Sequence, residues 1–369
     1  MNRNAPLINA VYYPSWRVYK DIPPSSLPLY KISTIYYAFA IPQENGSLGF
    51  LDEYADAQIP VDAELGCLNA LARVKRDNPH LKTILSIGGG TGSRAFLVLA
   101  STDHGRSAFA QAAADWVHKY SFDGVDIDWE HPRTPAEGQH YVALLHACRA
   151  ALPSPRYLLT TALPCDPSVL RMLDLQAVGT IIDHINLMAY DFSGPWSVVA
   201  GHHAQLFAAT ETGASSQLGL HLLLSHVPPN RVILGIPVYA RVFPGATCEG
   251  DLYEKEEGSN EGENEEDKEE LEIDYRDVPP EWKAEGTLQV DQGRAAAWAV
   301  VQRPGKKGRP GYPRSTSFVS LDVPATVRIK AGFARATGLG GLFYWTGAGD
   351  APNYEDSLVV AGFDALHGL

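Results

Sequence analysis

The stretch FDGVDIDWE, residues 122–130, places acidic side chains at the alternate positions 126, 128 and 130, with Val125, Ile127 and Trp129 between and beside them. In a β-strand, side chains two residues apart point to the same face, about 6.6 Å apart along the chain. Asp126, Asp128 and Glu130 therefore share one face, and apolar side chains occupy the other. The stretch predicts a buried strand that presents three carboxylates on one side.

Similar apolar, β-branched runs recur along the chain and alternate with helical patterns. We predict eight strands, at residues 7–13, 34–40, 82–87, 124–128, 157–162, 184–189, 232–238 and 341–345. We predict helices at residues 64–77, 107–120, 137–152, 169–176, 215–225 and 324–337. The alternation favours a single (β/α)8 TIM barrel in the α/β class. A doubly wound open sheet is the alternative, but no GxGxxG follows the first strand.

One long interval interrupts the alternation. Residues 242–317 separate the last two predicted strands, far more than an ordinary βα connection needs. We predict a small α+β insertion subdomain there, with residues 1–241 and 318–369 forming the catalytic barrel. Residues 254–272, called the acidic segment below, carry 11 acidic residues and two lysines, and we expect a disordered surface loop without a defined role.

Composition excludes several classes of protein. The 369 residues are 45% hydrophobic and 20% charged, which is typical of a globular protein. The formal charge of −13 comes mostly from the acidic segment, and no basic face for nucleic acid is visible. No apolar run is long enough for a membrane helix, and no signal peptide precedes the first strand. We expect a cytoplasmic protein by default, or a secreted one if a signal has been removed.

The three aligned carboxylates have a chemical consequence. Clustered acids repel one another, so at least one should keep its proton near neutral pH, as a general acid requires. A Mg²⁺ or Ca²⁺ site and a solvated strand end are the alternatives. The strand supplies only one wall of a metal cage, and no ligand-rich motif accompanies it. We interpret the row as catalytic, with no metal.

The motif DGVDIDWE resembles the signature of glycoside hydrolase family 18, the chitinases and their relatives. The resemblance covers nearly the whole chain, in family order. The matching pieces are VYYPSW at 11–16, YAFA at 37–40, SIGG at 86–89, MAYD at 188–191, PVYAR at 237–241 and GGLFYW at 340–345. The long interval after the seventh strand also resembles the family's insertion domain, and the whole resembles a fungal or bacterial-type chitinase.

The resemblance implies a substrate-assisted, retaining hydrolysis of β-1,4-linked N-acetylglucosamine chains. Glu130 would protonate the glycosidic oxygen while the substrate's acetamide attacks C1. Asp128 would hold the acetamide N–H, Asp126 would share a proton with Asp128, and Tyr190 would donate its hydroxyl to the acetamide carbonyl. No cofactor is implied. The expected partner is chitin or a chitooligosaccharide, with neither nucleic acid nor membrane, and we expect a monomer.

Further residues would bind the sugars. By resemblance, Trp345 forms the floor under the −1 sugar and Trp196 a platform on the leaving side. The other expected substrate-binding residues are Met188, Asp191, Tyr239, Arg241, Gly89, Tyr12 and Phe39. For Tyr12 and Phe39, a role in the barrel core is an equal alternative. We expect Trp16, Trp116 and Trp298 to be packing residues.

The chain departs from the family pattern at three positions near the site, of which Ala240, in place of glycine between Tyr239 and Arg241, is a small change. The family often has tryptophan where this chain has Gly90, so one leaving-side stacking surface is missing. Glu130 is followed by His131 rather than the commoner tyrosine, and a hydrogen-bonding role for His131 is favoured over tuning of the acid.

Other functions remain open at this point. A catalytically inactive chitin-binding lectin shares the fold, but such proteins typically lose the residue at Glu130. An endo-β-N-acetylglucosaminidase acting on N-glycan cores belongs to the same family. A third hypothesis is an interaction protein that binds a partner through the acidic segment.

Overall fold

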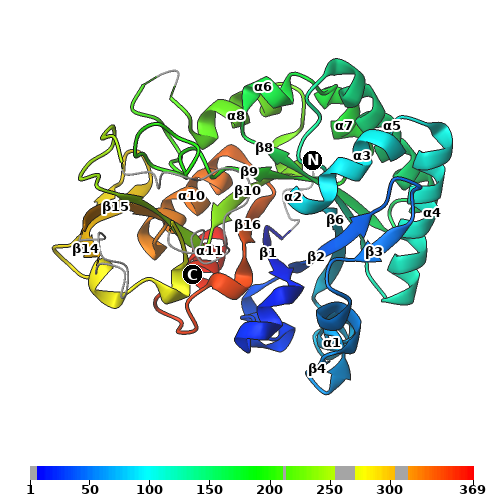
Figure 1. Cartoon of the computed structure of the whole chain (residues 1–369), viewed down its shortest axis with the longest axis horizontal. Coiled ribbons are helices and arrows are strands. Elements are labelled where there is room, and N and C mark those ends of the chain that lie inside the picture. Colours follow the sequence, from blue (N-terminus) through cyan, green and yellow to red (C-terminus); the bar gives the residue numbers. More distant parts are fainter. Residues whose placement is uncertain (1–5, 211–212, 254–270, 304–314) are drawn as a thin grey trace, which may run out of the picture.

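The computed structural model describes residues 6–210, 213–253, 271–303 and 315–369. Eight parallel strands form its centre, and they close into a barrel because β1 pairs with both β2 and β16 (Figure 1). The barrel strands are β1 (Ile8–Pro14), β2 (Thr34–Pro42), β6 (Lys82–Gly88), β7 (Gly124–Asp128), β8 (Leu158–Pro164), β9 (His184–Met188), β10 (Val232–Pro237) and β16 (Gly341–Trp345). All eight predicted strands are present, and the predicted (β/α)8 barrel is confirmed. The open-sheet alternative is wrong, since the sheet closes.

Helices follow most of the barrel strands and cover the outside of the barrel (Figure 1). They are α1 (Cys67–Asp77), α2 (Gly89–Gly92), α3 (Phe96–Leu99), α4 (Asp103–Lys119), α5 (Pro135–Ala151), α6 (Pro167–Leu170), α7 (Leu175–Ile181), α8 (Ser216–Leu224), α10 (Pro324–Thr337) and α11 (Leu358–His367). The helix predicted at residues 169–176 is wrong as one element, because α6 and α7 are separate. Helix α1 begins later than predicted because β5 (Glu64–Leu65) pairs with β4 (Pro60–Val61). Helix α11 was not predicted.

Two apolar layers hold the barrel. Outward-facing strand residues such as Val125 and Ile127 pack under the helices and are fully buried. Inward-facing residues such as Tyr36, Ile84 and Phe343 fill the interior. Gly124 opens β7 because a Cβ there would lie 1.9 Å from the carbonyl oxygen of Leu158 on the next strand. The glycine therefore lets β7 pair closely where the acidic row begins.

A second, antiparallel sheet lies beside the barrel, around the labels β14 and β15 in Figure 1. Its order is β12 (Glu272–Asp274), β11 (Tyr239–Pro244), β15 (Ser315–Leu321), β14 (Ala296–Arg303) and β13 (Leu288–Asp291). A single residue, Val238, separates the end of β10 from the start of β11, so the antiparallel sheet continues directly from the barrel. The domain boundaries given above stay a prediction. Residues 254–270, most of the acidic segment, lie outside the described residues.

Within the described residues, no helix combines the length and the apolar character that crossing a membrane requires.

Candidate active site

The acidic row lies at the carboxyl end of β7, the face of a (β/α)8 barrel on which active sites are built. Asp126 is 0% exposed and Asp128 is 3% exposed, while Glu130 is half-buried. On the opposite face, Trp129 is buried and stacks on Phe96 at 5.4 Å. The row is therefore no solvated strand end, because its acids point into the barrel and become more accessible toward Glu130.

Asp126 is held by three hydroxyl groups. Its Oδ2 accepts hydrogen bonds of 2.8 Å from the hydroxyls of Tyr12 and Ser86, and its Oδ1 accepts one of 2.7 Å from Thr160. Burial raises the pKa of Asp126, and these three hydrogen bonds oppose the rise. Asp126 is therefore fixed in place beneath Asp128.

Asp128 has fewer hydrogen-bond partners than Asp126. Its buried Oδ1 has no hydrogen-bond partner in the described structure. Burial first, then the charges of Glu130 and Asp126, raise the pKa of Asp128 well above its ordinary value. Because an unpaired buried carboxylate oxygen is costly, this atom is available to accept a hydrogen bond from a ligand.

Glu130 ends the row. Burial and then the negative charge of Asp191 raise its pKa. Its backbone N–H donates to the hydroxyl of Ser93 at 2.7 Å, which fixes the main chain where it leaves the strand. Three neighbouring acids with raised pKa values can retain a proton at neutral pH, which is the condition for a general acid.

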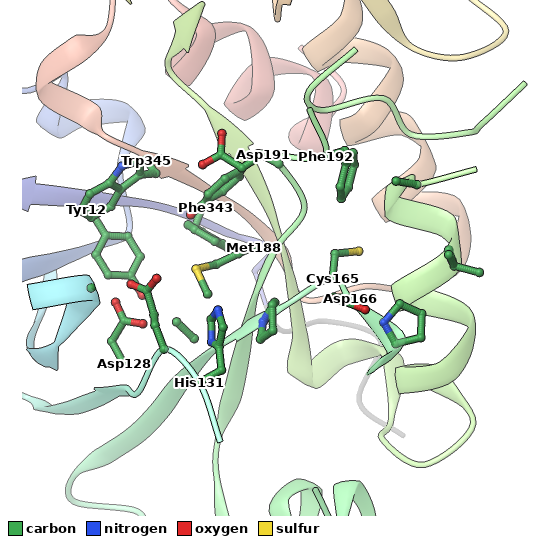
Figure 2. Close-up of a pocket in the computed structure, with 18 of the residues that line it drawn as sticks. Tyr12, Asp128, His131, Cys165, Asp166, Met188, Asp191, Phe192, Phe343 and Trp345 are labelled. Atoms are coloured by element: carbon green, nitrogen blue, oxygen red, sulfur yellow. The ribbon is translucent and has the colours of Figure 1, made fainter. Parts of the chain in front are cut away.

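A cavity of about 670 Å³ opens above this row. Tyr12, Trp345 and Asp128 lie toward one end, Met188 and His131 lie in the middle, and Phe192, Cys165 and Asp166 lie toward the other end (Figure 2). The remaining lining residues are Phe39, Gly90, Glu130, Ala162, Pro164, Pro167, Tyr190, Asp191, Trp196, Ala214, Ser215, Leu218 and Phe343. The cavity therefore joins carboxylates and aromatic walls in one elongated space.

Aromatic rings form one end of the cavity. The ring of Trp345 stacks on Phe39 at 5.7 Å and meets the edge of Tyr12 at 5.5 Å. The ring of Trp16 follows Phe39 at 6.4 Å. Trp16 is 36% exposed, so its predicted packing role is wrong. It lies in the 3₁₀ helix η1 (Ser15–Lys20) after β1, where the chain has left the core.

Tyr190 follows β9 and lines the same cavity. Its ring meets the edges of Tyr239 at 6.3 Å and Phe343 at 6.2 Å. Burial and then the nearby charge of Asp128 raise the pKa of its hydroxyl well above the ordinary value. The hydroxyl therefore stays protonated and can act as a hydrogen-bond donor beside Asp128.

Comparisons with known proteins agree with this geometry. Residues 8–350 match the sequence profile of glycosyl hydrolases family 18. The chain belongs to this family. It is 31% identical over 388 residues to Chitinase 1 of Aphanocladium album, covering 99% of this chain and 86% of that protein. It is 31% identical over 386 residues to Endochitinase 1 of Metarhizium robertsii, covering 98% and 85%.

Solved structures share the fold of this family 18 glycosyl hydrolase. The Ostrinia furnacalis Group IV chitinase in complex with allosamidin matches with a TM-score of 0.83 and 21% identity. The match covers 99% of each chain. At this identity, the likeness shows the common fold.

Asp191, a predicted substrate-binding residue of the family 18 hydrolase, lines the cavity. The residues that hydrogen-bond to it lie behind the cavity wall. Its Oδ1 accepts hydrogen bonds from the hydroxyl of Tyr239 at 2.8 Å and from Arg241 at 2.8 and 3.0 Å. Arg241 also pairs with Glu272 at 2.7 Å. Burial raises the pKa of Asp191, but His203, Arg241 and Tyr239 together lower it to about 2. Asp191 is therefore negatively charged at neutral pH, and its charge acts on Glu130.

The structure separates the predicted residues of the hydrolase into two groups. Those that line the cavity are Glu130, Asp128, Tyr190, Trp345, Met188, Asp191, Trp196, Tyr12 and Phe39. Asp126, Tyr239, Arg241 and Gly89 lie behind this lining. A Cβ on Gly89 would lie 2.7 Å from the ring of Phe39, so this glycine makes room for an aromatic wall. The individual roles of all these residues stay predictions.

Sequence reasoning missed the far wall of the cavity in this family 18 protein. The wall comes from residues 162–167 at the end of β8 and from Ala214, Ser215 and Leu218 around the start of α8. The position of residues 162–167 at the carboxyl end of a barrel strand was a usable signal. Within the described residues, no three His, Cys, Asp or Glu side chains are grouped so that they could hold a metal ion.

Proposed function

We propose that this protein is a chitinase that cleaves β-1,4-linked N-acetylglucosamine chains by a substrate-assisted, retaining reaction. The observation that carries the proposal is the acidic row that ends in the cavity. Asp128 there has an unpaired oxygen, Glu130 has a raised pKa, and Tyr190 lies beside them. The names of the curated relatives support chitin as the substrate.

The first step breaks the glycosidic bond. Glu130 gives its proton to the glycosidic oxygen, and the acetamide carbonyl oxygen of the −1 sugar attacks C1 as the leaving sugar departs. The product is an oxazolinium ion, so no carboxylate of the protein attacks the sugar. Holding an internal nucleophile below C1 can lower the activation barrier by about 7 kcal/mol or more.

Two side chains act on the acetamide. The unpaired oxygen of Asp128 accepts the acetamide N–H, and its negative charge stabilises the positive charge that develops on the ring. The hydroxyl of Tyr190, which burial keeps protonated, donates to the acetamide carbonyl. Asp126 is already held by three hydroxyls and shares a proton with Asp128 as the latter turns toward the substrate.

The second step restores Glu130. Water attacks C1 from the side that the leaving sugar vacated, and the Glu130 carboxylate takes a proton from that water. The C1–O bond to the acetamide breaks, and the sugar is released with its original anomeric configuration. One residue thus acts first as acid and then as base.

The aromatic rings of the cavity fit the apolar faces of sugar rings. Trp345 provides the floor at the −1 sugar, and Phe39 and Trp16 continue the aromatic surface outward from it. On the leaving side, Met188 and Trp196 line the cavity, and Gly90 leaves the facing wall open. We therefore propose that the non-reducing part of the chain binds along Trp345, Phe39 and Trp16.

The decisive experiment follows the products of chitohexaose by proton NMR during the first turnovers. We expect the β-anomer of shorter chitooligosaccharides to form first, and no cleavage of fully deacetylated chitosan. A high-mannose glycopeptide tests the endo-β-N-acetylglucosaminidase alternative, which cleavage of that substrate alone would favour. Binding of chitohexaose without cleavage would favour the lectin.

A further inference from the structure

Trp196 projects from an exposed turn on the leaving side of the cavity. Its side chain is 57% exposed and lines the cavity. The turn is closed by a hydrogen bond of 2.8 Å from the N–H of Ser197 to the carbonyl of Gly194. A side chain so exposed gains little from packing, so its usefulness as a platform depends on what fixes the turn beneath it.

The hydroxyl of Tyr253 lies beneath this turn. It is 3.0 Å from each of three carbonyl oxygens, those of Gly194, Pro195 and Ser197. These carbonyls belong to the residues on both sides of Trp196. The hydroxyl has one proton to donate, and the carbonyls before and after the tryptophan share it.

Tyr253 is itself firmly placed. Its ring meets Phe243 of β11 edge-on at 5.2 Å, within a buried apolar cluster that also contains Ala200, Ala246 and Phe318. The chain just before it runs antiparallel to the chain just after the turn, with Leu252 paired to Val199. Burial raises the pKa of Tyr253, so the hydroxyl stays protonated at neutral pH and can donate.

A second contact holds the tryptophan ring itself. The guanidinium of Arg241 lies 5.2 Å from the Trp196 ring centre, within the range of a cation–π contact. Arg241 is fixed by Asp191 on one side and by Glu272 on the other. Trp196 is thus restrained through its main chain by Tyr253 and through its ring by Arg241.

We propose that Tyr253 is a positioning residue for binding on the leaving side: its hydroxyl holds the Trp196 turn so that the indole ring is ready to receive the sugar that departs. This inference rests on the proposed function and adds a determinant of substrate length to it. Tyr253 does not line the cavity, so we expect its effect to reach the substrate through Trp196. For substrates without a leaving-side sugar, kcat/KM should not depend on the Tyr253 hydroxyl.

The test uses Tyr253→Phe in the full chain, which removes the hydroxyl and keeps the ring against Phe243. Two substrates are compared: chitohexaose, which extends across the leaving side, and N,N′-diacetylchitobiosyl fluoride, whose leaving group carries no sugar. We expect kcat/KM for chitohexaose to fall about three- to tenfold, mainly through KM. We expect kcat/KM for the fluoride to stay unchanged.

A double-mutant cycle with Trp196→Ala makes the test specific. In the Trp196→Ala background, adding Tyr253→Phe should change neither substrate further. Tyr13→Phe is the matched control, because the Tyr13 hydroxyl donates to the carbonyl of Ile22 at 2.9 Å on the outer side of the barrel. That control should show no difference between the two substrates.

Two results would overturn the inference. Equal effects of Tyr253→Phe on both substrates, or none on either, would mean that the hydroxyl has only a structural role or no role. Additive losses in the double variant would mean that it does not act through Trp196. Failure of the unmutated protein to hydrolyse either substrate would instead count against the proposed function, so the two failures are distinguishable.

Discussion

The hydroxyl of Tyr12 on β1 donates a 2.8 Å hydrogen bond to Asp126 on β7, across the interior of the barrel. The same hydroxyl accepts a hydrogen bond of 2.9 Å from the side-chain amide of Asn186 on β9. Three strands that are not neighbours are thus joined at one buried oxygen. Asp126, the first acid of the row, is therefore fixed by the interior of the barrel as much as by its own strand.

Tyr12→Phe should lower the free energy of unfolding by about 1–3 kcal/mol, because the Asn186 amide loses a buried partner. Chemical denaturation measures this loss. Tyr36→Phe is the control, since the Tyr36 hydroxyl makes a longer bond of 3.3 Å to the other end of the same amide. Its effect should be smaller, and equal losses from the two variants would contradict the assignment.

Glu130→Gln should lower kcat for chitohexaose by about 100-fold or more, because the amide keeps the shape but cannot donate the proton. Burial raises the pKa of Glu130, so above that pKa its charged form costs folding stability. The variant should therefore be at least as thermally stable as the unmutated protein at neutral pH. Glu281→Gln, at an exposed position, is the control and should change neither quantity. Near-normal turnover by Glu130→Gln would remove Glu130 from the mechanism.

The pH profile should depend on Asp191. Glu130 acts as an acid only while protonated, so activity is lost as the pH rises through its raised pKa. The charge of Asp191 contributes to that rise, after burial. Asp191→Asn should therefore lower the pKa of Glu130 and move the basic limb of kcat/KM to lower pH.

The control for this prediction is Glu272→Gln. Glu272 is the other carboxylate that binds Arg241, so its loss disturbs the same cation. It does not contribute to the shift at Glu130. In Glu272→Gln we expect the basic limb of the kcat/KM profile to stay at the same pH as in the unmutated protein. An equal shift of this limb in Glu272→Gln and Asp191→Asn would argue against the role of Asp191.

Gly90→Trp should strengthen binding on the leaving side. A Cβ at Gly90 would have no atom within 4 Å, so a side chain can start there without a clash and extend along the cavity that Gly90 lines. An added stacking surface is worth about 0.5–1.5 kcal/mol, which corresponds to a KM for chitohexaose about two- to tenfold lower. Gly90→Ala adds no ring and should leave KM unchanged. An unchanged KM in Gly90→Trp would place the leaving sugar elsewhere.

Much of the barrel could be predicted because its signals are local. The strands at Gly124–Asp128 and Gly341–Trp345 begin and end where the sequence pattern places them. The antiparallel sheet has no comparable signal, since β11 pairs with β12 and β15 from distant parts of the chain. Its extent depends on tertiary pairing that periodicity does not encode.

The candidate site shows the same division. Alternation along β7 predicted that Asp126, Asp128 and Glu130 share a face, and the structure places all three on the interior side. The exposure of Trp16 could not be predicted, because it depends on a 3₁₀ helix that carries the residue past the barrel rim. Tyr239 and Arg241 face Asp191 rather than the cavity, a distinction that only their three-dimensional packing decides.

The junction between β10 and β11 has a consequence for how such a protein can be altered. Strand β11 carries both Tyr239 and Arg241, which bind Asp191. The end of the antiparallel sheet next to the barrel therefore affects the charge near Glu130. The opposite edge of that sheet is β13. Grafted peptides or fused reporters should therefore be tolerated near β13, whereas a change of one residue in length at Val238 should disturb catalysis.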